Sequence, residues 1–543
     1  MIYFGQYLIN SSSHKHSHKI KTDSNGIIPV IKQIQNIPLQ KIFQKISDDG
    51  KKKHSILLES AKFDSYSGNK SICSADPCLN IVGKKQEFEI NALNKIGKEF
   101  IEELEKDFDF CKEIDFCKKK IKGTIKNSGN SDVSEKERLK KVTQFDVLRK
   151  IVFKFNAPQI HITPYVGLFG AISYDFIDQF EKLPKNKKNE LKEPLYEMNF
   201  YDSLFFADHL NSKTYLIENA LPFKNNAKEQ TENCIKRIEK KEKKIKNTKL
   251  KTHKKNKIIS EFVSDTSKKE FEKKVNLIKK HIVNGSIFQA VISRTISTKL
   301  NNNPLKIYEE LYRLNPSPYM FYFHNSDGVL LGSSPETFLR VQNVEGKKLV
   351  QIKPIAGTKP RGIKEKKIDY DFDSKLETEL KMDKKELAEH AMLLDLSRND
   401  IAKISEKGSR KVISPFSIEK YSYVQHLVST VQGNLKKDLD AFHAYLACMN
   451  MGTLSGAPKV EAMKLIRKYE KNERGFYGGA IGYITPNDEM DSAIIIRAVR
   501  IKNKKAFVRT GAGIVFDSDP EKEFFETEKK ALACIKAINA GAD

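Results

Sequence analysis

Polar and apolar residues along the chain alternate with two periodicities, and the clearest helical periodicity runs from Asp383 to Asp400. That segment contains no Pro or Gly, and its apolar residues recur every three to four positions. Residues of high helix propensity dominate it, so the pattern predicts an amphipathic helix. Glu386 and Glu389 lie three residues apart and therefore point the same way on that helix. Taken alone, the pair is more typical of a solvated acidic face than of a metal site.

Most of the second half follows the other periodicity, in which short runs of apolar and β-branched residues end at turn residues. The predicted strands are IFQAVISRTIS, NPSPYMFYF, GVLLGSSPETFLRVQ, KLVQIKPIAG, YSYVQHLVSTVQGNL, GGAIGYI, SAIIIRAVRIK and KAFVRTGAGIVF. Helices are predicted over 437–449 and 456–470. A last helix starts at Asp519-Pro520, where Asp suits the N-cap and Pro the first helical position. Many strands at hairpin spacing with helices between them predict an α+β fold.

Composition divides the chain into four predicted segments. They are a polar tail at 1–26, an N-terminal domain at 27–224, a basic Lys-rich linker at 225–262 and a C-terminal domain at 263–540. The tail contains a His-rich tract, for which a frayed end is the simpler interpretation than metal binding. The linker region contains no run that could build a core, and we interpret it as a solvated helix and connection.

The net charge of +26 raises the question of a nucleic-acid partner. The excess is mostly Lys spread along the whole length, whereas nucleic-acid sites gather Arg and aromatic residues in one patch. We therefore predict no nucleic-acid partner. Because no apolar run reaches the roughly 18 residues that a membrane span needs, we predict no membrane association either. The seven cysteines form no C-x-x-C pair, which favours reduced thiols in a cytoplasmic protein.

A second acidic pair makes the first one more informative. Glu523 and Glu526 are also three residues apart, on the predicted last helix. Acids near a helix N-terminus are stabilising in any case, which is the simpler explanation. Two helices that each offer a Glu pair nevertheless supply the minimum for Mg²⁺, if water and substrate oxygens complete an octahedron.

Several segments could hold an anion. Gly511–Gly513 interrupts a strand, so that backbone N–H groups could approach a ligand closely. Ser455–Lys459 opens a helix, and Gly357-Thr358 sits in a turn after a strand. With Arg497, which we place in a strand core, they would hold a small dianion. Each segment alone is more often an ordinary turn.

Two further side chains are candidates for chemistry. His426 lies on a predicted strand, where a lone His is more often a satisfied core residue than a catalyst. Tyr477 lies beside two glycines, and ordinary packing explains it equally well. The residues alone leave both alternatives open.

From about 264 to 540 the chain resembles the chorismate-utilising enzymes, and within that family the large subunits of anthranilate synthase. Ten blocks carry the resemblance: GSIFQAVISR, NPSPYMFYF, GSSPETFLRV, PIAGTKPRG, DKKELAEHAMLLDLSRND, IEKYSYVQHLVSTVQG, GTLSGAPKVEAM, GFYGGAIGY, AIIIRAVR and RTGAGIVFDSDPEKEFFET. In the first half, SILLESAKFDS and GAISYDFIDQFEKLP match the same pattern. The resemblance implies an α+β fold of two facing antiparallel sheets flanked by helices.

The resemblance also implies roles for individual residues. Glu389 and Glu526 resemble Mg²⁺ ligands, with Glu523 beside them. The residues that resemble catalytic groups near the reacting ring and its leaving hydroxyl are His426, Glu386 and Thr453. The residues that resemble chorismate contacts are Gly357, Thr358, Tyr477, Arg497, Gly511, Ala512 and Gly513.

Two motifs resemble a feedback pocket for L-tryptophan. They are LLES in the first half and NPSPYM in the second, and LLES alone is only a strand end. The residues expected to line the pocket are Glu59, Ser60, Lys70, Pro318, Tyr319 and Met320.

Two positions distinguish members of the family. Members that make aminodeoxychorismate often carry a nucleophilic Lys where this chain has Ala356, and isochorismate and salicylate synthases carry a Lys where it has Gln289. Both differences favour ammonia as the nucleophile and anthranilate as the product. The alternatives are aminodeoxychorismate synthase component I and, less favoured, a nucleic-acid-binding protein with an inactive enzyme core.

The chain shows no glutaminase signature. The resemblance therefore implies a separate glutamine amidotransferase subunit, anthranilate synthase component II, in a heterotetramer of two large and two small subunits.

Overall fold

The structure of the chain is a computed structural model. It describes residues 2–4, 7–9, 26–61, 69–126, 134–223, 226–248, 261–300, 302–365, 367–421 and 424–540. The His-rich tract of the predicted tail lies outside the described residues.

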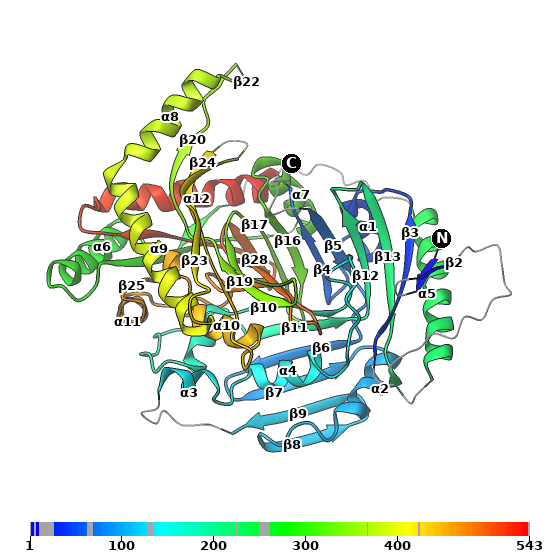
Figure 1. Ribbon diagram of the computed structural model, residues 1–543. Coiled ribbons are helices and arrows are strands. Elements are labelled where there is room, and N and C mark those ends of the chain that lie inside the picture. Colours follow the sequence, from blue (N-terminus) through cyan, green and yellow to red (C-terminus); the bar gives the residue numbers. More distant parts are fainter. Residues whose placement is uncertain are drawn as a thin grey trace.

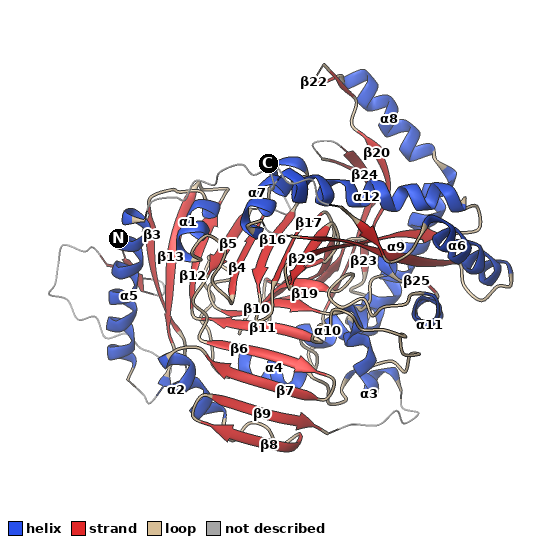
Figure 2. Cartoon of the chain, turned by 180° about the vertical axis from the view of Figure 1, so that it is seen from behind, coloured by secondary structure: helices blue, strands red, loops and turns tan. Residues whose placement is uncertain are grey.

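Two large antiparallel sheets face each other, with helices around them (Figures 1 and 2). The first sheet runs, in spatial order, through β14 (Val263–Ser264), β15 (Gln289–Lys299), β29 (Lys505–Ile514), β28 (Ala498–Lys502), β17 (Val329–Ser334), β16 (Tyr319–His324), β4 (Ser55–Glu59), β5 (Lys70–Ser74), β12 (Ser203–Asp208), β13 (Lys213–Ala220), β3 (Ile28–Ile34), β1 (Ile2–Phe4) and β2 (Tyr7–Ile9), and β25 (Gly456–Ala457) pairs with β15.

The second sheet runs through β20 (Ile355–Pro360), β24 (Val424–Asn434), β19 (Lys347–Ile352), β18 (Thr337–Val344), β27 (Met490–Ile494), β26 (Ala480–Ile484), β10 (Gly167–Ile172), β11 (Tyr196–Tyr201), β6 (Leu79–Lys84), β7 (Glu87–Ala92), β9 (Lys120–Ile125) and β8 (Cys111–Cys117), and β23 (Lys411–Lys420) pairs with β24. A small hairpin joins β21 (Ile363–Lys364) and β22 (Lys367–Ile368). The predicted fold class is confirmed.

Both halves of the sequence contribute strands to both sheets. In the first sheet β16 pairs with β4, and in the second β26 pairs with β10. Aromatic residues cross the same divide: Phe145 packs edge-on against Tyr445, with ring centroids 5.3 Å apart. The core between the sheets is therefore continuous, and the predicted domain boundaries stay predictions about sequence segments.

The predicted linker contains a helix that does contribute to a core, so that part of the expectation is wrong. α5 (Ala227–Asn247) packs on β13 and β3, and its Cys234 and Ile238 are fully buried. Arg237 forms ion pairs with the buried Asp202 and Glu218, at 3.0 and 2.9 Å. The helix is thus anchored by three buried apolar positions, Cys234, Ile238 and Ile245, and by matched charges.

Two helices carry the acidic pairs where the sequence predicts them. α9 (Lys384–Ile404) begins after Asp383, whose side chain accepts hydrogen bonds from the backbone N–H groups of Lys385 and Glu386. α12 (Pro520–Ala540) packs on β29, and α9 packs on β24 and β20.

The remaining helices are α1 (Leu39–Ile46), α2 (Lys95–Leu104), α3 (Glu135–Leu139), α4 (Phe145–Val152), α6 (Lys268–Val283), α7 (Pro304–Leu314), α8 (Tyr370–Met382), α10 (Ala441–Cys448) and α11 (Lys459–Tyr469), with the 3-10 turns η1 (Tyr174–Gln179) and η3 (Gly452–Leu454). In Figure 1, α8 projects away from the body of the molecule. None of the helices described is both long and apolar enough to cross a membrane.

Candidate active site

The two acidic pairs act on one another electrostatically. The pKa of Glu389 is raised to about 7, mainly by burial, and the nearby carboxylates of Glu386, Glu523 and Glu526 contribute to the rise against the opposing effect of Lys385. Burial also raises the pKa values of Glu386 and Glu523. Oε2 of Glu523 is buried and has no hydrogen-bond partner. The pairs on α9 and α12 therefore share one partly buried region of negative charge.

Few positive charges balance this carboxylate cluster, which we define as Glu386, Glu389, Glu523 and Glu526. Lys385 lies 3.8 Å from Glu389, and Lys530 lies 2.5 Å from Glu526. Carboxylate oxygens and an unpartnered buried oxygen fit a hard divalent cation such as Mg²⁺. Within the described ranges, no three His, Cys, Asp or Glu side chains form a metal site by themselves. The cluster could thus supply only part of a coordination sphere.

Glu386 lies directly over Gly357, which sits at a register shift within strand β20 and not in a turn as the sequence suggests. This glycine has a φ of +60°, and a Cβ atom on it would lie 3.1 Å from Oε2 of Glu386. Both the left-handed backbone and the close approach therefore require glycine. The irregular part of β20 therefore meets one carboxylate of α9 at the edge of the second sheet, where β20 pairs with β24.

His426 of β24 is held by the same part of β20. Its Nδ1 lies 3.1 Å from the carbonyl oxygen of Gly357 and 3.0 Å from the hydroxyl of Thr358. Because a carbonyl oxygen only accepts, the contact with Gly357 places the proton on Nδ1. Nε2 is then the basic nitrogen of the ring. The structure thus brings together three of the predicted site residues, Gly357, Thr358 and His426, with Glu386.

Arg497 lies in the turn between β27 and β28, with a φ of +52°, and not in a strand core as the sequence suggests. Its guanidinium donates to the carbonyl oxygen of Lys530 at 3.2 Å and has no carboxylate within ion-pair distance among the residues described. Burial lowers its pKa. A partly buried cation without a carboxylate partner among the described residues is the electrostatic complement of a carboxylate ligand.

Lys530 connects Arg497 to the glycine strand, because its Nζ donates to the carbonyl oxygen of Gly511 at 3.2 Å. A Cβ atom on Gly511 would lie 3.1 Å from the hydroxyl of Tyr477, and one on Gly513 would lie 2.6 Å from the amide of Gln289. The side chain of Ala512 is buried in the core with α6 and α11, so only its backbone faces the strand surface. Burial raises the pKa of Tyr477 to about 12, which keeps the phenol protonated as a hydrogen-bond donor.

The sequence analysis missed Glu336, which follows β17. Burial raises its pKa to about 8, while the nearby Thr453 hydroxyl and Lys530 lower it slightly. Oε1 of Glu336 and Oγ1 of Thr453 are both buried without a partner at hydrogen-bonding geometry. At neutral pH Glu336 is therefore a protonated acid close to Thr453. Its only sequence signal is an acidic residue inside the GSSPETFLRV block.

A separate cavity of about 290 Å³ lies between the two sheets. All six residues predicted for the feedback pocket line it: Glu59, Ser60, Lys70, Pro318, Tyr319 and Met320. Residues of the second sheet, including Arg340 and Asp491, line its opposite side. The hydroxyl of Tyr319 joins the two sides, since it lies 3.0 Å from Asp491.

The cavity combines a buried acid and a buried base. Burial raises the pKa of Glu59 to about 7, although Tyr308 and Gln40 donate to its carboxylate at 2.6 and 3.0 Å. Burial lowers the pKa of Lys70 to about 8, and its ammonium donates to the carbonyl oxygen of Thr163 at 2.8 Å. Such a pair suits a small zwitterion.

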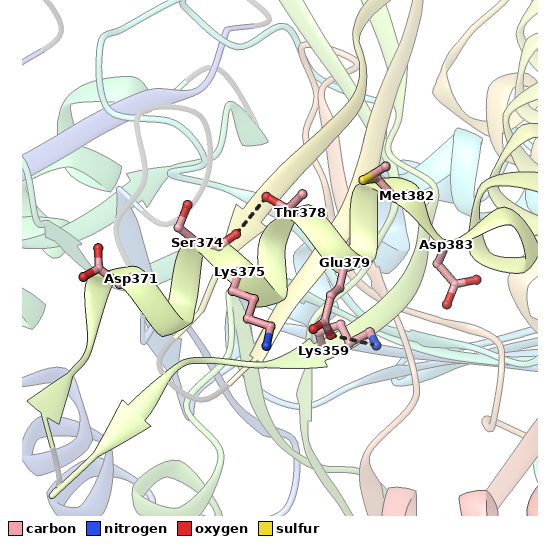
Figure 3. Close-up of a pocket in the computed structure, with 8 residues that line it drawn as sticks. All are labelled: Lys359, Asp371, Ser374, Lys375, Thr378, Glu379, Met382 and Asp383. Carbon is pink, nitrogen blue, oxygen red and sulfur yellow. Dashed lines mark hydrogen bonds and ion pairs between the residues drawn. The ribbon is translucent and has the colours of Figure 1, made fainter.

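A further hollow, of about 670 Å³, is a surface depression and not part of either site. It is formed by Lys359 of β20 and one face of α8, down to Asp383 (Figure 3). The side chains in Figure 3 are mainly charged or hydroxyl-bearing, and Lys359 pairs with Glu379 at 3.7 Å. No predicted site residue lines it.

Comparisons with known proteins agree with this arrangement. A family profile described as chorismate binding enzyme matches residues 105–536. Anthranilate synthase component 1 of Buchnera aphidicola subsp. Pemphigus spyrothecae is 41% identical over 90% of this chain and 92% of its own length. The protein of the same name from Vibrio cholerae serotype O1 is 38% identical over 89% and 91%. A crystal structure of anthranilate synthase component I from Streptococcus pneumoniae TIGR4 superposes with a TM-score of 0.67 at 28% identity, covering 87% of this chain and 94% of that one.

Proposed function

Because the chain belongs to the family of chorismate-binding enzymes, we propose that it is the large subunit of an anthranilate synthase. It would convert chorismate and ammonia to anthranilate, pyruvate and water. One observation carries the proposal: relatives named anthranilate synthase component 1 are about 40% identical over nine-tenths of both chains. The residues that match the family profile, 105–536, include the carboxylate cluster.

Arg497 and the strand Gly511–Gly513 would hold a carboxylate of chorismate. The argument rests on charge: the partly buried guanidinium has no carboxylate within ion-pair distance among the described residues, and Lys530 joins it to the glycine strand, whose backbone N–H groups suit an anion. Tyr477 would donate a hydrogen bond from the opposite side of Gly511. Gly357 and Thr358 would close the site at the edge of the second sheet.

Glu389 and Glu526 would hold Mg²⁺, with Glu386 and Glu523 beside them. When bound, the ion would supply Lewis acidity and a fixed template for the second carboxylate of the substrate. The unpartnered Oε2 of Glu523 and the raised pKa of Glu389 support this proposal, because a cation would relieve the repulsion among the four carboxylates. Lys385 and Lys530 lie beside the same carboxylates and would partly neutralise them when no cation is bound.

The proton transfers would be carried by residues on either side of the site. Ammonia adds to the ring as the hydroxyl leaves, so that an acid must protonate the departing oxygen. Glu336 is suited to this step because its pKa of about 8 keeps it protonated at neutral pH, beside Thr453. Nε2 of His426 would act as the base. It would accept a proton either from the nitrogen after it has added to the ring or from the ring carbon as pyruvate is eliminated. Glu386 lies near His426 and is the second candidate for this role.

The 290 Å³ cavity would be the feedback site for L-tryptophan. Glu59 would pair with the ammonium group of the amino acid, and Lys70 with its carboxylate. Pro318, Tyr319 and Met320 would pack around the indole. Ser60 would add a hydrogen bond from the end of β4.

Ammonia would come from a glutamine amidotransferase subunit, consistent with the designation component 1 of the relatives. We propose a heterotetramer of two large and two small subunits in the cytoplasm. The alternative product, aminodeoxychorismate, is less favoured because Ala356 offers no nucleophile.

A product assay tests the proposal. Purified protein is incubated with chorismate, Mg²⁺ and ammonium salt, and products are separated by chromatography. Anthranilate, identified by its fluorescence, is the expected product. Accumulation of isochorismate or aminodeoxychorismate instead would show that the assignment within the family is wrong.

A further inference from the structure

Beneath the proposed substrate site lies a buried ion cluster that the proposed chemistry does not use. It consists of Glu470, at the end of α11, with Arg474 and Arg509. Glu470 and Arg474 are each 3% exposed. Arg474 bonds Glu470 through two nitrogens, at 2.7 and 3.0 Å, and Arg509 bonds it at 2.6 Å. Burial alone would raise the pKa of Glu470, but the two guanidiniums lower it to about 2.

Arg474 uses its remaining donors on two segments that carry proposed substrate contacts. One nitrogen donates to the carbonyl oxygen of Leu454 at 2.6 Å, immediately after Thr453. Another donates to the carbonyl oxygen of Val291 at 2.8 Å. Val291 is the residue of β15 that pairs with Gly513. The guanidinium of Arg474 therefore holds both the 3-10 turn that contains Thr453 and the strand β15, which pairs with the strand Gly511–Gly513.

The same cluster surrounds the ring of Tyr477. The guanidinium carbons of Arg474 and Arg509 lie 5.7 and 5.8 Å from its ring centroid. The backbone N–H of Tyr477 also donates to the carbonyl oxygen of Arg474, at 3.2 Å. Two cations over one aromatic ring fix its orientation, and with it the direction of the hydroxyl.

We propose that Arg474, which is held by its ion pair with Glu470, is a positioning residue. It fixes the relative positions of Thr453, the strand Gly511–Gly513 and Tyr477 so that all three can contact chorismate. It does not touch the substrate. The cluster has two guanidiniums and one carboxylate, so it also places a net positive charge behind the seat of a dianion. This inference rests on the proposed function, because the three segments matter together only if they share a ligand.

Arg474→Lys tests the proposal because it keeps the charge and loses the planar fork of donors. We expect kcat/KM for chorismate to fall by roughly 100-fold or more, as is typical when catalytic groups are displaced by about 1 Å. KM for ammonium should change little, since ammonia makes no contact that this cluster fixes. The double variant Arg474→Lys/Tyr477→Phe should lower kcat/KM for chorismate no further than Arg474→Lys alone, because both substitutions act through the ring of Tyr477.

Arg149→Lys is the matched control. Arg149 of α4 forms a similar two-nitrogen bond with Asp440, at 2.7 and 3.1 Å, in a part of the molecule without proposed site residues. Both variants are assayed at the same folded fraction, measured by thermal unfolding. If Arg474→Lys lowers kcat/KM for chorismate no more than Arg149→Lys does, the proposal is wrong.

Ser293→Ala decides the question if Arg474→Lys does not fold. The Ser293 hydroxyl donates to Glu470 at 2.8 Å and accepts from Arg509 at 2.9 Å, so its loss loosens the cluster with little change in packing. A fall of about 10-fold in kcat/KM for chorismate supports the proposal, and an unchanged value overturns it. A wild-type chain that forms no anthranilate contradicts the proposed function, and the inference falls with it. An active wild type with unaffected variants contradicts the inference alone.

Discussion

Two partly buried glutamates, Glu389 in the carboxylate cluster and Glu59 in the second cavity, have pKa values raised to about 7 but lie in different surroundings. Burial is the main cause of the raised pKa in both. Glu389 is surrounded by three further carboxylates, whereas Glu59 accepts hydrogen bonds from Tyr308 and Gln40. An opposite charge relieves repulsion among neighbouring carboxylates more directly than a hydrogen-bond donor does, so the first region calls for a cation. A single buried acid beside Lys70 calls instead for a zwitterion.

The comparison predicts its largest effect at Glu389. Glu389→Gln should lower kcat for anthranilate formation by at least roughly 100-fold, because the proposed cation loses a ligand. The fold should survive, since the change removes repulsion among buried carboxylates. Steady-state kinetics with thermal unfolding as a control measure both effects. Full activity in the variant would show that the cation does not bind in this region.

Glu59→Gln should act only on inhibition. Half-inhibition by L-tryptophan should require at least about 10-fold more ligand, because a buried ion pair is lost, while the uninhibited rate is unchanged. Inhibition of the wild type should strengthen from pH 6 to about pH 7 as Glu59 ionises, and should weaken again as Lys70 loses its proton near pH 8. Inhibition curves at several pH values test both statements. An equal loss of basal activity would mean that the two regions are not distinct.

The cluster also makes stability depend on pH. The pKa of Glu389 is about 7 in the folded chain and 4.5 ordinarily. Between pH 4.5 and pH 7, the folded chain therefore binds more protons at this residue than the unfolded chain does. Stability in metal-free buffer should therefore fall as pH rises from about 4.5 through 7. Mg²⁺ should raise the unfolding midpoint more at pH 8 than at pH 5.5. The slope should flatten in Glu389→Gln, and an unaltered slope would contradict the assignment to this residue.

The smallest effect is expected at the start of α9. Asp383→Ala removes the side-chain cap that bonds two backbone N–H groups and should destabilise the chain by about 1 kcal/mol. Chemical denaturation measures it. Because the helix carries Glu386 and Glu389, the concentration of Mg²⁺ for half-maximal activity should rise slightly. Unchanged stability would show that the cap does not hold the helix.

Local signals explain what the sequence could predict. α9 and α12 follow from helix propensity and from Asp383 and Asp519-Pro520 at their starts, and the strands follow from short apolar runs. From the sequence alone, residues 94–120 favour one amphipathic helix, but they contain α2 and the strand β8, because their later apolar residues alternate. Residues 148–175 have strand character in the sequence, yet their first part belongs to α4.

Other features depend on contacts between distant residues and could not be predicted. α5 has few apolar positions, and its place in the core depends on buried Asp202 and Glu218 of another segment. Glu336 is one of 70 acidic residues, and only burial beside Thr453 distinguishes it. The turn at Arg497 follows from strand pairing on both sides of it. The site assignments themselves stay proposals until they are measured.

The dependence of anthranilate formation on Mg²⁺ tests the central claim most directly. The initial rate with saturating chorismate and ammonium is followed by fluorescence while Mg²⁺ is titrated into metal-free protein. The account predicts no turnover without the ion and a saturable rise to full activity, shifted to higher concentration in Asp383→Ala and absent in Glu389→Gln. A full rate in the presence of a chelator would contradict it.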